Sequence, residues 1–123
     1  MTTTEPRTPD RLSDDAAEAV RALSHATLTQ SAAGWEYPGD AYSTVGNLAI
    51  LAHRLPQALG QLESFIGEHE DAGRLRSDHG PDDLPHRLLD FHAAMAQAIQ
   101  QARSLGVALD RAHQALMAVG SAE

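Results

Sequence analysis

The sequence predicts an all-α fold: a long antiparallel helical hairpin plus a shorter N-terminal helix, as a three-helix bundle or as a larger helical bundle in a dimer. The main observation is a pair of apolar stripes, within residues 45–66 and 88–119. In both stripes the steps alternate between three and four residues, which keeps one side of a helix facing a neighbour. Segments with Gly and Pro at 34–40 and 70–83 separate three helical patterns. The stripes consist of Val45, Leu48, Ala52, Leu55, Leu59, Leu62 and Ile66, and of Leu88, Phe91, Met95, Ala98, Ala102, Leu105, Leu109, Ala112, Leu116 and Val119.

The first helical pattern is short. Residues 1–11 are polar and contain two prolines, so we expect a disordered N-terminal tail, followed by a single helical bundle domain over residues 12–120. Ser13 is predicted to cap the first helix, which ends near Ser31 and has a thin apolar face. At about 20 residues this helix spans roughly 30 Å, so it is too short to cover the hairpin.

The second pattern predicts a helix from about Asp40 to about His69. Pro56 lies inside this helix, but the apolar stripe keeps its phase between Leu55 and Leu59. We therefore predict one kinked helix rather than two separate helices.

The last pattern predicts a helix that Asp82 or Asp83 caps and that ends near Gly120, with Pro85 in its first turn, where a missing N–H is harmless. The two long helices have similar lengths and a loop of residues 70–83 between them, which predicts an antiparallel hairpin. Because the first helix cannot cover this hairpin, part of the apolar surface would stay exposed in a monomer. We therefore predict a homodimer.

Composition favours a protein partner over other partners. The chain has 123 residues, enough for one domain, and a formal net charge of -8. Such a charge disfavours binding to nucleic acid, which needs clustered cations, and to anionic lipid. The sequence has no Cys, no signal-peptide pattern and no apolar segment long enough to span a membrane. We expect a cytoplasmic protein that binds another protein.

The sequence motifs indicate no enzyme chemistry. We find neither a nucleophile elbow nor a phosphate-binding loop, so we predict a non-enzymatic protein without catalytic residues or a cofactor. Residues 68–86 are acidic and His-rich, but their spacing fits no recognised metal motif, which favours a charged connection. Asp110-x-x-His113 is the nearest match to a di-iron motif and lies beside apolar stripes, as a surface pair would. No metal site is predicted. The candidate ligands of the acidic segment are Glu68, His69, Glu70, Asp71, Asp78, His79, Asp82, Asp83 and His86.

Three histidines flank positions of the apolar stripes: His53, His92 and His113. Such histidines are typically boundary residues with one edge in water. Because imidazole titrates near neutral pH, a dimer that depends on pH is an alternative interpretation.

Residues 34–40 hold the only Trp and one of the two Tyr residues of the chain. Aromatic side chains on a loop at the end of a bundle are good anchors for a partner. The alternative is that Trp35 and Tyr37 fold back and close the open end of the bundle. The candidate partner-binding residues are Trp35, Glu36, Tyr37, Pro38 and Asp40.

The loop sequence GWEYPGD and the helix that follows it to Ile66 resemble small helical proteins of actinomycetes, over about residues 34–119. That resemblance implies no particular activity. A second comparison is with the helical-hairpin substrates of type VII secretion, which carry Trp-x-Gly in the turn between their long helices. Here Trp35 precedes the hairpin instead.

Together these patterns predict a non-enzymatic protein–protein interaction module, an adaptor or regulatory helical protein. Two alternatives stay open. One is a substrate similar to those of type VII secretion. The other is an acidic antagonist of a basic protein, of the antitoxin, immunity or DNA-mimic type, which would act through residues 68–71 and 78–83.

Overall fold

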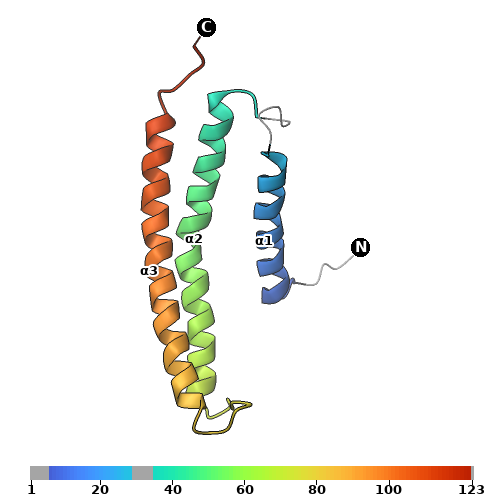
Figure 1. Cartoon of the computed structure of the whole chain (residues 1–123), viewed down its shortest axis with the longest axis vertical. Coiled ribbons are helices and arrows are strands. Elements are labelled where there is room, and N and C mark those ends of the chain that lie inside the picture. Colours follow the sequence, from blue (N-terminus) through green and yellow to red (C-terminus); the bar gives the residue numbers. More distant parts are fainter. Residues whose placement is uncertain (1–5, 29–34, 123) are drawn as a thin grey trace.

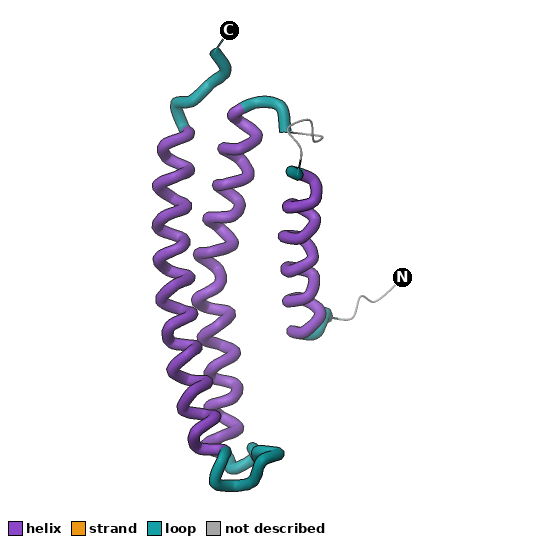
Figure 2. Tube along the Cα trace, viewed as in Figure 1, coloured by secondary structure: helices purple, strands orange, loops and turns teal. Residues whose placement is uncertain are grey.

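A computed structural model describes residues 6–28 and 35–122 of the chain, which contain three helices (Figure 1). These are α1 (Pro9–Ala26), α2 (Pro38–Asp71) and α3 (Leu84–Leu116). The two long helices, α2 and α3, pack antiparallel and are joined by the loop of residues 72–83 (Figure 2). No strand occurs in the described part of the chain. The predicted all-α fold, a long hairpin with a shorter helix before it, is confirmed.

Helix α1 begins earlier than the sequence suggested. Pro9 opens it, because the fixed φ of proline suits the first turn. Residues 9–11 therefore belong to the helix and not to a tail; residues 1–5 of that predicted tail lie outside the described residues. Ser13 is not the cap, and its hydroxyl donates to the carbonyl of Asp10 at 3.0 Å. The helix ends at Ala26, before the predicted end near Ser31, a residue that also lies outside the described part.

Helix α1 makes no contact with α2 or α3 among the described residues. The packed part of the fold is therefore the hairpin. The predicted contact between the first helix and the hairpin does not occur in these residues.

Helix α2 runs without interruption through Pro56, so the prediction of one helix rather than two is confirmed. It begins at Pro38, and its start is held by Asp40, whose carboxylate accepts the N–H groups of Glu36 and Tyr37, both at 2.8 Å. This carboxylate is in the first turn of the helix and reaches back to backbone N–H groups at the helix start, which have no acceptor within the helix. The helix ends at Asp71.

Helix α3 begins as the sequence predicted and ends sooner. Asp83 is the N-cap residue and Pro85 lies in the first turn. The carboxylate of Asp83 accepts hydrogen bonds from Ser77 and Arg87, which ties the loop to the helix. The helix ends at Leu116 rather than near Gly120.

The contact between α2 and α3 consists of small residues. The buried residues of the described chain are Ala49 and Ala52 on α2, and Ala102 and Gly106 on α3. Small side chains let two helix axes approach closely. Each helix is turned about its own axis so that its small residues face the other helix. The predicted stripes therefore do not fully face each other: Leu62 is 50% exposed and Leu105 48% exposed.

Candidate functional site

Three histidines lie in the contact between α2 and α3, each opposite a glycine of the other helix. A Cβ placed on Gly46 would stand 2.8 Å from Nε2 of His113, and one on Gly106 would stand 2.8 Å from Cε1 of His53. A Cβ on Gly67 would stand 4.0 Å from Cε1 of His92. The glycines thus create the space that the imidazole rings fill.

These positions extend a prediction. The sequence suggested boundary residues with one edge in water, and the side chains of His53 and His92 are 48% and 32% exposed. The structure adds that the three rings lie over glycines of the facing helix. The signal was present as a repeat: Gly46 and His53 are seven residues apart, and so are Gly106 and His113. In an antiparallel pair this spacing sets each glycine opposite the histidine of the other repeat. An interior helical glycine is unfavourable by about 1 kcal/mol unless packing requires it.

His53 also forms a polar pair across the hairpin. Its Nε2 lies 2.7 Å from Oδ2 of Asp110 on α3. The pair borders an open groove of about 550 Å³ that also contains Ser43, Asn47 and His113. The ring of His113 also stacks on the ring of Tyr42, with ring centroids 4.0 Å apart. The groove offers hydroxyl, amide, imidazole and carboxylate groups, and no described hydroxyl is hydrogen-bonded to either histidine.

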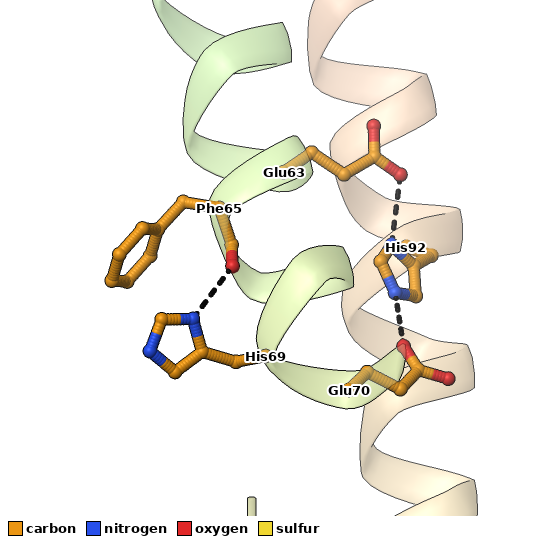
Figure 3. Close-up of polar contacts among 5 residues, drawn as sticks. All are labelled: Glu63, Phe65, His69, Glu70 and His92. Carbon is orange, nitrogen blue, oxygen red and sulfur yellow. Dashed lines mark hydrogen bonds and ion pairs between the residues drawn. The ribbon is translucent and has the colours of Figure 1, made fainter. Parts of the chain in front are cut away.

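His92 bridges two carboxylates of α2 near the closed end of the hairpin (Figure 3). Its Nδ1 lies 2.9 Å from Oε2 of Glu63, and its Nε2 lies 2.9 Å from Oε1 of Glu70. Only the imidazolium form can donate from both nitrogens. The hydrogen bonds to Glu70 and then Glu63 raise the pKa of His92 above its usual 6.5, against a smaller opposing effect of desolvation.

The bridge around His92 is not a metal site. The two carboxylates bind opposite nitrogens of one ring, so the three groups do not converge on a common point. No group of three or more His, Cys, Asp or Glu side chains suited to a metal ion occurs among the described residues. Beside the bridge, Nδ1 of His69 lies 3.1 Å from the carbonyl oxygen of Phe65 on its own helix.

The two groups weighed as metal ligands from the sequence, the acidic segment and the pair of Asp110 and His113, contain carboxylates that bind other side chains of the protein. Within the acidic segment, Glu70 binds His92, Asp83 binds Ser77 and Arg87, and Asp78 lies 3.3 Å from Arg76. Asp110, the first residue of the possible di-iron pair, binds His53.

The predicted contact patch lies at the start of α2. Trp35 and Pro38 are half-buried, Glu36 is exposed and Tyr37 is 64% exposed. The carboxylate of Asp40 points back to the backbone, and its hydrogen bonds with Tyr37 and then Glu36 hold its pKa below 3.8. Asp40 therefore stabilises the helix start, and the exposed side chains are those of Glu36 and Tyr37. Gly34, the first residue of this loop, lies outside the described residues.

Comparison of the chain with family models, with curated proteins and with solved structures gives no match. None of the three described helices combines the length and apolar character needed to cross a membrane.

Proposed function

We propose that this protein is a non-enzymatic protein–protein interaction module, an adaptor or regulatory helical protein that works as a homodimer. The proposal depends on one observation: the hairpin buries small residues and exposes large apolar side chains. Its buried residues are alanines and a glycine, whereas large apolar side chains on both helices stay exposed. These exposed side chains are Ile50, Leu51, Leu62, Phe65, Leu89, Leu105 and Val107.

A hairpin of this kind gains most of its apolar burial from another surface. Removing apolar area from water contributes roughly 25 cal/mol per Å², and two helices that touch through alanine and glycine remove little of it. Exposed leucine and phenylalanine side chains in such number are typical of surfaces that bind protein.

The loop before α2 supplies a second, smaller contact in this proposal. Tyr37 is exposed beside the half-buried Trp35, at the open end of the hairpin. Large aromatic side chains contribute strongly to binding because they cover much area with few rotatable bonds. We assign binding of a further protein to this loop, with Glu36 at its rim.

Affinity capture from the native cell tests the proposal with three baits: wild type, Trp35→Ala and Met117→Ala. Met117 is 67% exposed just beyond α3, so its truncation is a control for loss of any exposed apolar side chain. We expect one protein to bind wild type and the control, to be lost from Trp35→Ala, and to remain bound in about 1 M salt, where charge interactions are screened. A protein that stays on Trp35→Ala and is released by salt would instead indicate an acidic antagonist.

A further inference from the structure

The contacts between glycines and histidines fix the register of α2 against α3. His53 of α2 lies over Gly106 of α3, and Gly46, seven residues earlier on α2, lies under His113, seven residues later on α3. Each step forward along α2 therefore corresponds to one step backward along α3. By this count residue 103 of α3 lies level with residue 56 of α2, and residue 107 lies level with residue 52.

Residues that follow the contact line lie on the same side of the hairpin in both helices. The buried residues Ala49, Ala102 and Gly106 lie in the contact, and the next residue along a helix is turned by about 100°. Because α2 and α3 are antiparallel, this turn leads to one common side. A residue four positions further along returns to nearly the same side. On this side lie the residues that we call the arginine patch: Ile50, Arg54, Arg103 and Val107.

The arginine patch consists of an apolar pair and a cationic pair. Ile50 and Val107 are 48% and 49% exposed, and by the register they differ by two residues along the hairpin axis, which is about 3 Å. Arg54 and Arg103 are exposed and also differ by two residues, one helical turn nearer the closed end of the hairpin. The patch therefore presents two apolar side chains and, about 6 Å further along the axis, two arginines.

The two arginines form a positive surface in an acidic chain, whose formal net charge is -8. With histidine counted as neutral, Arg54 is the only charged residue in 41–62 and Arg103 the only one in 91–109. Neither has an ion pair or a side-chain hydrogen bond within the part of the chain that the structure describes. The arginines that do form ion pairs there are Arg7, Arg21, Arg76 and Arg87.

The carboxylates nearest in sequence to these arginines are bound elsewhere. On α2, Oε2 of Glu63 lies 2.9 Å from Nδ1 of His92. On α3, Oδ2 of Asp110 lies 2.7 Å from Nε2 of His53. Hydrogen bonds between arginine and a carboxylate are charge-assisted and roughly twice as strong as neutral ones. The arginine patch is therefore suited to an acidic side chain from outside the hairpin.

Open grooves continue the arginine patch in both directions along the hairpin. Toward the open end, a groove of about 550 Å³ includes Ile50, Ser43 and Asn47. Toward the closed end, a groove of about 490 Å³ along α2 includes Gln57 and Gln61. Amide and hydroxyl groups beside apolar side chains are typical of non-obligate protein interfaces, in which arginine is enriched. A groove that runs along a helix fits an amphipathic helix of a partner.

We infer that the arginine patch binds an amphipathic helix of a partner protein through an acidic side chain. Residues four apart on such a helix are neighbours, which matches the one-turn separation between the apolar pair and the arginines. An apolar side chain of the partner packs between Ile50 and Val107, and a carboxylate one turn away accepts hydrogen bonds from Arg54 and Arg103. Salt screens exposed charges beyond about 8 Å, so distant acidic residues oppose this contact little. The inference rests on the proposed function and names the chemistry of a partner.

Fluorescence anisotropy with the full chain and two labelled peptides tests the inference. Both peptides are alanine-based helices in which leucine and a charged residue alternate at steps of three and four residues. The charged residue is glutamate in one peptide and lysine in the other. At about 0.15 M salt we expect wild type to bind the glutamate peptide at least about tenfold more tightly than the lysine peptide. Arg54→Glu with Arg103→Glu should reverse this preference.

Arg11→Glu with Arg111→Glu is the matched control, because it makes the same change in net charge at exposed arginines outside the patch. We expect this control to bind the glutamate peptide within about threefold of wild type. If charge reversal in the patch reduces the helix content seen by circular dichroism, Arg54→Gln with Arg103→Gln replaces it. That variant should bind the glutamate peptide at least about threefold more weakly than wild type.

Equal affinities of wild type for the two peptides would overturn the inference, as would an equal loss of affinity in the patch variant and the control. Absence of binding to the glutamate peptide at up to about 1 mM protein would overturn it too. Each of these results leaves the proposed function standing, because affinity capture with Trp35→Ala decides that function separately.

Discussion

The imidazole of His113 fills the space over Gly46, with Nε2 only 2.8 Å from where a Cβ of that residue would stand. His53 has the same relationship to Gly106, also at 2.8 Å. Two Gly-x6-His repeats, one per long helix, thus interlock in opposite directions. This arrangement sets both the register and the close approach of the hairpin.

Substituting these glycines should destabilise the fold, although Gly→Ala normally stabilises a helix. Because a methyl group at Gly106 would displace the ring of His53, we expect Gly106→Ala to lower the free energy of unfolding by about 1–2 kcal/mol. Gly60→Ala is the matched control, since nothing lies within 4 Å of its Cβ position. The control should gain about 0.5–1 kcal/mol. Urea unfolding at one chain concentration measures both, and an equal gain in the two variants would refute the interlock.

The bridge of His92 to Glu63 and Glu70 predicts a stability that depends on pH. Because the folded-state pKa of His92 is raised above 6.5, its stabilisation is fully present below the unfolded pKa and is lost as pH rises through the folded pKa. We expect the Tm difference between wild type and His92→Gln to be larger near pH 6 than near pH 8.5.

A background variant checks the cause of that difference. With Glu63→Gln and Glu70→Gln in place, the effect of His92→Gln should lose its dependence on pH, because the carboxylates that favour imidazolium are gone. A pH dependence that persists would assign it to another group.

Asp40 should act on the helix rather than on a partner. Because its carboxylate accepts two backbone N–H groups at the start of α2, we expect Asp40→Ala to lower the Tm by a few degrees. Its pKa is lowered in the fold, so this stabilisation is present above pH 3.8 and disappears as pH falls through the folded pKa. Thermal melts at neutral and acid pH measure it; a Tm unchanged at neutral pH would contradict this role.

Pro56 should weaken α2 without breaking it. Its nitrogen cannot donate to the carbonyl of Ala52, so we expect Pro56→Ala to raise the free energy of unfolding by about 1–2 kcal/mol. Urea unfolding gives the value. A decrease would show that packing of the half-buried proline ring outweighs the restored hydrogen bond.

The sequence predicted the hairpin because its signals are local. Pro85 and Asp83 mark the start of α3, and the constant phase around Pro56 indicated a continuous α2. The contact line between the helices was predicted in part: Ala52 and Ala102 belong to the stripes and are buried, whereas the equally buried Ala49 and Gly106 do not belong to them. Periodicity shows that Leu62 and Leu105 lie on an apolar side, but not which of two neighbours that side faces.

The small residues explain the difference. Ala49 and Gly106 contribute little to an apolar pattern, yet they occupy the contact because they let the helices approach and the histidines fit between them. The loop with Trp35 was identified from composition, whereas the inward carboxylate of Asp40 depends on the backbone path and needed the structure.

In the proposed homodimer, a second copy of the chain covers exposed apolar side chains of the hairpin. Sedimentation equilibrium of the wild-type protein over micromolar concentrations measures whether this dimer forms. We expect a mass of twice 13.1 kDa, with dissociation only on dilution. A mass of 13.1 kDa at every concentration up to about 100 μM would contradict it, because the folded state of an obligate homodimer depends on its association.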